Sequence, residues 1–181
     1  EARINGIVTH KEPLRAKEHV AYVSENVMLY TNFTAIQNLD YFARLGGKNH
    51  YTKNDYRDAL LRVGLQEEAH YKRLKTYSKG MRQKCGIAIA ILKGASNIIL
   101  DEPTSGLDPK AGAEFMALLA ELRGEGKAIL MSTHDIFRAK DAADRVGIMR
   151  EGRILAIRSR AELKTDNLER LYLEFMEGAA A

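Results

Sequence analysis

Two adjacent carboxylates, Asp101 and Glu102, follow the apolar run NIIL and directly precede Pro103. A short apolar run that ends in turn-forming residues predicts a strand buried on both faces, and proline cannot continue a hydrogen-bonded ladder. The acids are therefore expected at the carboxyl end of a strand, where open parallel sheets bind ligands and where carboxylates suit metal and phosphate chemistry. Taken alone, the pair is equally compatible with acids that only open a turn, with Thr104 and Ser105 as caps.

Three further segments could contribute to the same chemistry. YSKGM (77–81) precedes a predicted helix that Ser78 would cap, SGLD (105–108) lies immediately beyond the acids, and STHD (132–135) ends the apolar run KAILMST. His134 would then stand at the same sheet edge as the acids, where an imidazole can bond a phosphate and report its presence. Cys85 and the other four histidines are unclustered in the sequence, which favours structural roles for them.

The first half of the chain changes from strands to helices. A β-hairpin is expected from the strand Ala2 to Ile4 and the turn Asn5-Gly6, followed by a strand from His19 to Ser24. Three helices are predicted next: one from the Thr34–Gln37 capping box to Gly46-Gly47, one from Asp55 to Val63, and one from Ser78 to about Lys93. Residues from about 31 to 95 thus form a predicted helical insertion.

From Asn97 onward, strands and helices alternate, which is typical of a parallel sheet built by right-handed crossovers. The expected strands are NIIL, KAILMST and VGIM, with a helix between the first two and another from about Ile136 to Ala143. GRILA (152–156) would add an edge strand. An amphipathic helix is predicted at the end from its apolar positions Leu168, Leu171, Tyr172 and Phe175.

Composition limits the class of protein. With 181 residues, 45% of them hydrophobic, the chain can bury one core, so one domain with a small appendage is expected. The net charge of +4 comes from basic and acidic residues scattered along the sequence, so no nucleic-acid partner is expected. One cysteine and no leader predict a cytoplasmic protein, and the longest apolar stretch, Cys85 to Leu92, is too short to span a bilayer.

The order YSKGM, LDEP, SGLD and STHD, in these predicted elements, resembles the nucleotide-binding subunit of an ATP-binding-cassette (ABC) transporter from about Ala21 to Ala156. The resemblance implies an α/β fold: a P-loop NTPase (RecA-like) parallel sheet core, lacking its N-terminal part, with an inserted α-helical subdomain. It implies four segments: residues 1–30 as the remainder of the N-terminal β region and hinge loop, 31–95 as the helical signature subdomain, 96–165 as the ATPase core lobe, and 166–181 as the C-terminal helix.

The same resemblance implies a role for each site residue, with ATP and Mg²⁺ as cofactors. Asp101 would hold Mg²⁺ through a water, Glu102 would orient or deprotonate the attacking water, and His134 would bond the γ-phosphate. The remaining nucleotide-binding residues implied by the family are Ser78, Gly80, Asp108 and Glu25. Ser78 and Gly80 belong to the signature loop, usually LSGGQ, which acts on ATP held by the other subunit of a head-to-tail homodimer.

Three residues depart from the family pattern and indicate one branch of the family. Lys79 and Met81 replace the usual Gly and Gln of the signature, and Glu25 stands where the hinge loop normally carries Gln. These residues resemble the exporter-type branch, whose subunits serve membrane partners that move drugs, sodium, lipids or polysaccharides, or that mature copper enzymes. Glu25 could still contact the metal through a water. A transmembrane subunit would insert a helix near Asn26 to Asn38, which places the chain at the inner face of the cell membrane.

The phosphate-binding string G-x-x-x-x-G-K-[ST] does not occur in the sequence, and Gly46-Gly47-Lys48 is the nearest imitation. The resemblance therefore predicts a fragment of a larger ATPase that does not by itself bind ATP appreciably and that leaves apolar faces near NIIL and KAILMST uncovered. Two alternatives stay open: a non-transport ABC ATPase of the DNA-repair or ribosome-associated kind, and a degenerate cassette that does not hydrolyse ATP. The compact helical insertion favours transport, and the intact Asp101, Glu102 and His134 favour hydrolysis.

Overall fold

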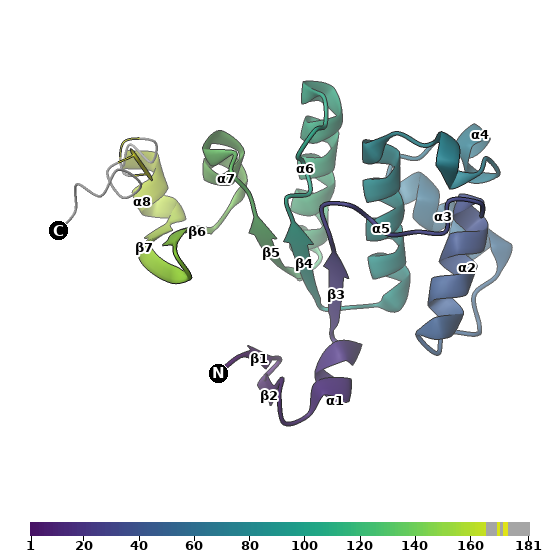
Figure 1. Cartoon of the computed structure of the whole chain (residues 1–181), viewed down its shortest axis with the longest axis horizontal. Coiled ribbons are helices and arrows are strands. Elements are labelled where there is room, and N and C mark those ends of the chain that lie inside the picture. Colours follow the sequence, from purple (N-terminus) through teal and green to yellow (C-terminus); the bar gives the residue numbers. More distant parts are fainter. Residues whose placement is uncertain (166–169, 171, 174–181) are drawn as a thin grey trace. The chain divides into compact units, whose positions relative to one another are not determined.

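The computed structural model describes residues 1–165, 170, 172 and 173, and within them the chain forms two compact units. The first unit is Glu1–Ser132 and the second is Thr133–Ala181. The residues discussed as a site below lie in the first unit, except His134, which lies in the second. Figure 1 shows the elements of both units with the labels used in this text.

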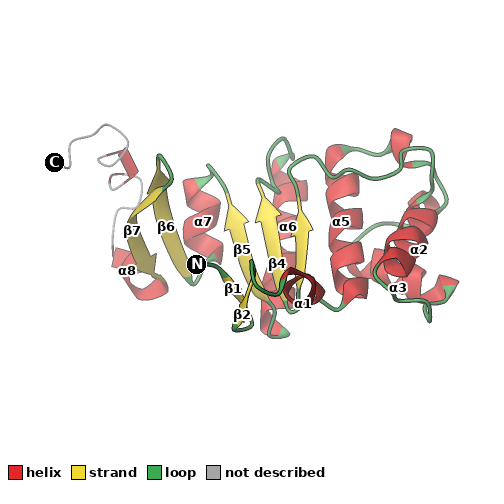
Figure 2. Cartoon of the chain, turned by 60° about the horizontal axis from the view of Figure 1, so that its bottom comes forward, coloured by secondary structure: helices red, strands yellow, loops and turns green. Residues whose placement is uncertain are grey.

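A parallel three-stranded sheet lies at the centre of the first unit (Figure 2). Its strands, in spatial order, are β3 (Val20–Val23), β4 (Asn97–Asp101) and β5 (Ala128–Ser132). The register places Asp101 opposite Ser132, and it places Tyr22, Ile99 and Leu130 in one row across the sheet. The predicted parallel pairing of NIIL with KAILMST is therefore confirmed.

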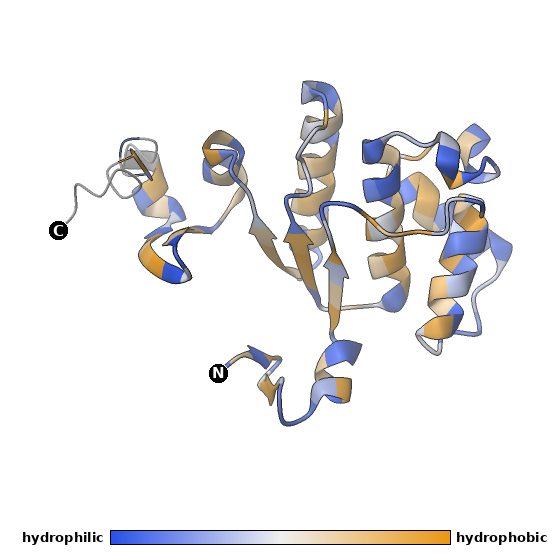
Figure 3. Cartoon of the chain, in the orientation of Figure 1, coloured by the Kyte–Doolittle hydropathy of each residue, from blue (hydrophilic) through white to orange (hydrophobic). Residues whose placement is uncertain are grey.

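Helices cover one face of this sheet. Its strands are mostly apolar (Figure 3), and alternate residues such as Ile98 and Leu100 are buried with the helices α5 (Lys79–Lys93) and α6 (Pro109–Gly124) in one core. The opposite face is open, because Tyr22 is 62% exposed and Leu130 is 68% exposed. The prediction that the strand NIIL is buried on both faces is wrong for this chain. The prediction of an uncovered apolar face near KAILMST is confirmed at Leu130.

The connection from β3 to β4 is helical, as predicted. Thr34 caps α2 (Ala35–Leu45) by the expected capping box with Gln37, and Gly46 follows the helix. The second helix, α3 (Lys53–Arg62), begins two residues earlier than the predicted Asp55 because Thr52 forms a capping box with Asp55 that sequence analysis missed. The short helices α4 (Glu67–His70) and η1 (Leu74–Thr76) were not predicted, since neither is long enough to show an apolar period.

The third helix, α5, is capped by Ser78 and ends at Gly94, which has a φ of +72°. Its Gly86 packs against the end of β3: a Cβ at this position would lie 3.0 Å from Val23 Cγ1 and 3.3 Å from Val27 Cγ1. The absence of a side chain there lets α5 approach the sheet closely. Its position beside β3 in turn brings the first turn of α5 to the carboxyl ends of the strands (Figure 1).

The N-terminal hairpin is confirmed as β1 (Arg3–Ile4) paired antiparallel with β2 (Ile7–Val8), with Asn5 and Gly6 at positive φ in the turn. Helix α1 (Pro13–Glu18) follows and was not predicted, although Pro13 at its start is a common first helical residue. In residues 1–165, 170, 172 and 173 no helix combines the length and the apolar character that crossing a bilayer requires.

The second unit holds α7 (Ile136–Ala142), β6 (Arg145–Arg150), β7 (Arg153–Ser159) and α8 (Arg160–Thr165). The prediction that VGIM extends the parallel sheet is wrong: β6 pairs antiparallel with β7, in a separate two-stranded sheet. The tight turn at Glu151 and Gly152, both at positive φ, returns the chain directly onto β6. The predicted terminal helix lies mostly outside the described residues, as do its positions Leu168, Leu171 and Phe175.

Gly86→Ala should destabilise the protein, because the added methyl group meets Val23 and Val27 in a packed core. Overpacking of this kind costs about 1–3 kcal/mol of the free energy of unfolding. The control is Gly124→Ala at the end of α6, where nothing lies within 4 Å of the new Cβ. This control should be neutral or stabilise by up to about 1 kcal/mol. Urea denaturation of both variants tests the comparison, and equal stabilities would contradict it.

Candidate functional site

The carboxylate of Asp101 is held by a side chain from each neighbouring strand. Ser132 donates from its Oγ to Asp101 Oδ1 at 2.7 Å, and Tyr22 donates from its hydroxyl to Asp101 Oδ2 at 3.2 Å. All three residues point to the open face of the sheet, because strand residues alternate between faces and the register aligns them. Desolvation first, and then the negative charge of Asp101, raises the pKa of Tyr22 above its usual value, so Tyr22 stays a hydrogen-bond donor at neutral pH.

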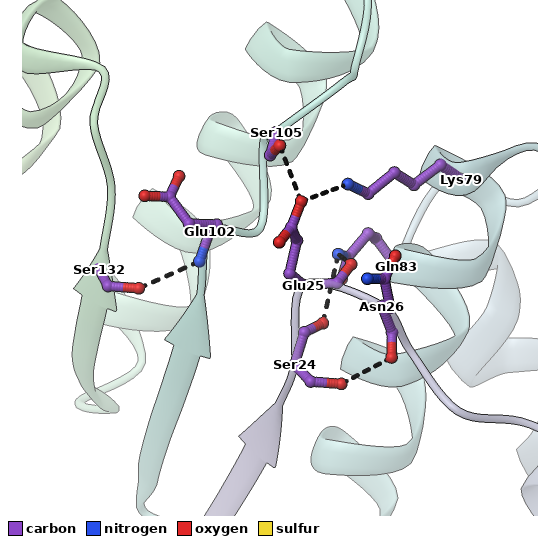
Figure 4. Close-up of polar contacts among 8 residues, drawn as sticks. All are labelled: Ser24, Glu25, Asn26, Lys79, Gln83, Glu102, Ser105 and Ser132. Carbon is purple, nitrogen blue, oxygen red and sulfur yellow. Dashed lines mark hydrogen bonds and ion pairs between the residues drawn. The ribbon is translucent and has the colours of Figure 1, made fainter.

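Glu102, directly after β4, has an unusual backbone conformation. Its φ is +43°, in the left-handed region that a residue with a side chain rarely adopts. Its backbone N–H donates to Ser132 O at 3.2 Å and to Ser132 Oγ at 3.1 Å (Figure 4). Ser132 therefore bonds to the carboxylate of Asp101 and to the backbone of Glu102 at once. Left-handed conformations of this kind occur at sites where the surrounding structure holds them in place.

Glu25, in the loop after β3, lies against the start of α5 (Figure 4). Its Oε1 accepts from Lys79 Nζ at 3.0 Å and from Ser105 Oγ at 3.0 Å. These two hydrogen bonds and the charge of Lys79 lower the pKa of Glu25 below its usual value, so the carboxylate is ionised at neutral pH. The expected contact of Glu25 with a metal stays a prediction.

Ser78 and Gly80 form the first turn of α5, as predicted. The Ser78 hydroxyl accepts from the backbone N–H of Met81 at 3.2 Å, which is the expected N-cap. A Cβ on Gly80 would lie 3.3 Å from Leu107 Cδ2, so the turn SGLD packs closely on this loop. The same region lines a cavity of about 210 Å³, whose walls include Ser78, Gly80, Met81 and Leu107.

Two predicted site residues sit at helix starts that follow the strands. Asp108 caps α6 by accepting from the backbone N–H of Ala111 at 2.9 Å. His134 follows the end of β5 by two residues, is exposed, and immediately precedes Asp135, the N-cap of α7. The end of β4 with Asp101 and Glu102, the end of β3 before Glu25 and the start of α5 at Ser78 lie at the same end of the first unit (Figure 1), while His134 belongs to the second unit.

The donor set fits a hydrated Mg²⁺ that binds together with a nucleotide. Among residues 1–165, 170, 172 and 173, no three His, Cys, Asp or Glu side chains are grouped to hold a metal ion by themselves. Mg²⁺ commonly uses one or two carboxylates and completes its shell with waters and substrate phosphates, which is compatible with Asp101 alone. Sequence analysis did not identify the supporting residues Tyr22, Ser105 and Ser132, because only the register and the loop packing bring them together.

Comparisons with known proteins identify the family of this chain. The family model described as "ABC transporter" matches residues 1–105. The chain is 41% identical over 154 residues to the uncharacterized ABC transporter ATP-binding protein YdbJ of Bacillus subtilis, covering 84% of this chain and 49% of that protein. It is 37% identical to the bacitracin transport ATP-binding protein BcrA of Enterococcus faecalis, covering 86% of this chain and 49% of that protein. The chain thus spans about half the length of these curated relatives.

A solved structure of an ATP-binding subunit of an ABC transporter superposes with a TM-score of 0.77 and 28% identity. The superposition covers 96% of this chain and 75% of that one. The predicted fold class, an α/β P-loop NTPase core with a parallel sheet, is therefore confirmed.

Glu102→Gly should raise the free energy of unfolding, because glycine adopts the left-handed φ without steric cost. Relief of this conformation is worth about 1 kcal/mol. The control is Ala117→Gly at an exposed position of α6, which should lower the free energy of unfolding by about 1 kcal/mol because glycine is a poor helix former. Chemical denaturation checks the opposite signs, and a destabilised Glu102→Gly variant would argue against strain at this position.

Proposed function

We propose, given that the chain belongs to the ABC transporter family, that it forms part of an ATP-binding subunit whose hydrolysis of ATP powers transport by a membrane partner. One observation carries the proposal. Asp101 and Glu102 stand at the carboxyl end of β4 with Asp101 braced by Tyr22 and Ser132, which suits chemistry on a phosphate at this sheet edge. Bound Mg-ATP would supply the phosphoryl group and the cation that neutralises its charge.

Each site residue then has a distinct task. Asp101, with its carboxylate orientation fixed by two hydrogen bonds, would hold the Mg²⁺ through a water. Glu102 would accept a proton at its carboxylate from the water that attacks the γ-phosphate. His134 would donate a hydrogen bond to that phosphate from its imidazole. No phosphate loop occurs in the 181 residues, so a test of hydrolysis requires a full-length subunit that includes one.

The start of α5 would act on a second subunit. Its N-terminal N–H groups and partial positive charge suit an anion, Ser78 caps the helix, and Gly80 lets the turn at Leu107 pack closely against it. In a head-to-tail homodimer this turn would contact the γ-phosphate held by the partner, and Asp108 would lie beside it at the start of α6. The site would therefore be complete only in the dimer.

The surface after Glu25 has the character of a docking site for the transmembrane subunit. Met28 is 84% exposed, and Tyr30 packs against Phe33 with ring centroids 5.1 Å apart. Tyr30 also meets Tyr41 of α2 edge to face at 4.8 Å. An open hollow of about 460 Å³ lies beside these rings, lined by Phe33, Gln37, Asp40, Tyr41, Arg44 and Leu45. Exposed aromatic residues are common anchors at interfaces, so a helix from the membrane partner would bind here and hold the subunit at the inner face of the membrane.

The exporter-type branch is favoured by the signature YSKGM. Lys79 and Met81 replace the usual Gly and Gln, and Glu25 replaces the usual Gln of the hinge loop. The similarity to a bacitracin transport ATP-binding protein supports this branch. The transported molecule itself would be chosen by the membrane subunit, because this chain would contribute only residues of the ATP site.

Glu102→Gln should leave ATP binding intact and nearly abolish turnover in the full-length subunit, because the amide cannot accept the proton of the attacking water. Loss of a general base lowers the rate by about 10²–10⁴-fold. Glu151→Gln is the matched control: Glu151 also has a positive φ, 50°, but lies in the turn of the β6–β7 hairpin. Steady-state phosphate release should be unchanged in this control. Undiminished turnover by the Glu102→Gln enzyme would remove Glu102 from its proposed role.

In the full-length subunit, Ser78→Arg should impair ATP-dependent dimerisation more than nucleotide binding by the monomer, because the bulky cation occupies the partner-facing turn. Thr52→Arg is the control, since Thr52 caps α3 in the same way but outside the proposed interface. Both variants lose a cap worth about 1 kcal/mol of stability. Light scattering with Mg-ATP should detect dimers of the Thr52→Arg protein but not of the Ser78→Arg protein, and equal dimerisation of both would contradict the proposal.

A further inference from the structure

Three segments of the first unit meet at the carboxylate of Glu25 (Figure 4). Glu25 belongs to the loop after β3, Lys79 to the first turn of α5, and Ser105 to the turn after β4. Lys79 Nζ and Ser105 Oγ both donate to the same oxygen, Glu25 Oε1, each at 3.0 Å. The Lys79 and Glu25 side chains are 28% and 41% exposed, so the ion pair is only partly screened by solvent.

The backbone of the same loop is held from α5 by a second contact. The Gln83 amide, fully buried one turn after Lys79, donates from its Nε2 to the carbonyl oxygen of Glu25 at 2.8 Å. Its Nε2 also lies 3.4 Å from the carbonyl oxygen of Ser24. The amide fixes the position of the loop, and the ammonium group of Lys79 fixes the direction of the Glu25 side chain.

We propose that Lys79 is a positioning residue for the hinge loop. Its ammonium group neutralises the charge of Glu25 and holds the Glu25 carboxylate next to the start of α5 and Ser105. This inference rests on the proposed function. Lys79 and Glu25 are 54 residues apart in the sequence, and the structure places their charged groups in direct contact. The pair carries no net charge.

The need for this neutralisation follows from the surrounding charges. The negative charge of Asp101 acts on Glu25. A triphosphate at the same sheet edge would add further negative charge. A carboxylate without a counter-ion would repel that ligand, whereas a carboxylate paired with Lys79 presents no net charge.

The contacts of Glu25 also connect three segments of the proposed ATP site through hydrogen bonds. The signature turn at Lys79, the hinge loop at Glu25 and the turn that carries Ser105, three residues after Glu102, share one hydrogen-bonded point. A shift of the signature turn would therefore move the hinge loop, next to the aromatic surface proposed above for the membrane partner.

A double-mutant cycle tests the inference. The KM for Mg-ATP and kcat are measured for the full-length subunit without substitutions and for three variants of it. The variants are Lys79→Gln, Glu25→Gln and the combination of both. Lys79→Gln should raise KM about three- to fivefold, as expected for loss of one partly exposed ion pair. The double variant should return to within about twofold of the unchanged protein, because no carboxylate is left uncompensated. Higher ionic strength should shrink the effect of Lys79→Gln.

Arg57 and Glu67 provide the control ion pair. Arg57 of α3 pairs with Glu67 of α4 at 2.9 Å, with side chains that are 38% and 55% exposed. Arg57→Gln should leave KM for Mg-ATP unchanged, since this pair lies outside the candidate site. An equal rise in KM for Arg57→Gln, or additive effects of Lys79→Gln and Glu25→Gln on KM, would overturn the positioning role.

The free energy of unfolding in urea can be measured for the same four proteins, each as the 181-residue chain. This measurement separates the inference about Lys79 from the proposed function. Non-additive unfolding free energies support the ion pair, and additive ones overturn it, whether or not the protein hydrolyses ATP. An unchanged full-length subunit that releases no phosphate from ATP would instead refute the proposed function.

Discussion

The parallel pairing of β3, β4 and β5 is the constraint on which the rest of the first unit depends. Parallel strands cannot be joined by a tight turn, so the chain must cross over between each pair, and both crossovers contain helices. All three carboxyl ends consequently lie at one edge. This geometry brings Glu25, Asp101 and Ser132 together, although more than 100 residues separate the first of them from the last.

Close packing of α5 on β3 converts that edge into a structured site. Gly86 permits the approach, and the buried Gln83 bonds the loop that follows β3. The first turn of the helix is then positioned so that Lys79 reaches Glu25 and Gly80 meets Leu107. The helix N-terminus, the hinge loop and the two acids are therefore fixed by the same core that stabilises the fold.

The carboxylates of Asp101 and Glu25 each have specific hydrogen-bond partners at this edge. Asp101 accepts from two hydroxyl groups, and Glu25 accepts from an ammonium and a hydroxyl group. Ser132 also holds the backbone of Glu102 in its left-handed conformation. Acids constrained in this way keep their orientation before a ligand arrives, which would lower the cost of binding the cation of the proposed Mg-ATP.

The sequence by itself determined the local features: the strands NIIL and KAILMST, the caps Thr34 and Ser78, the N-terminal hairpin and the acids at a strand end. These follow from patterns within a few residues, such as apolar runs, cap hydroxyls and turn glycines. Only the tertiary structure decided that Lys79 pairs with Glu25, that Tyr22 and Ser132 brace Asp101, and that β6 pairs with β7 instead of extending the parallel sheet. A one-dimensional pattern predicts that a strand exists, but strand partners and loop contacts depend on register and packing between residues far apart in the chain.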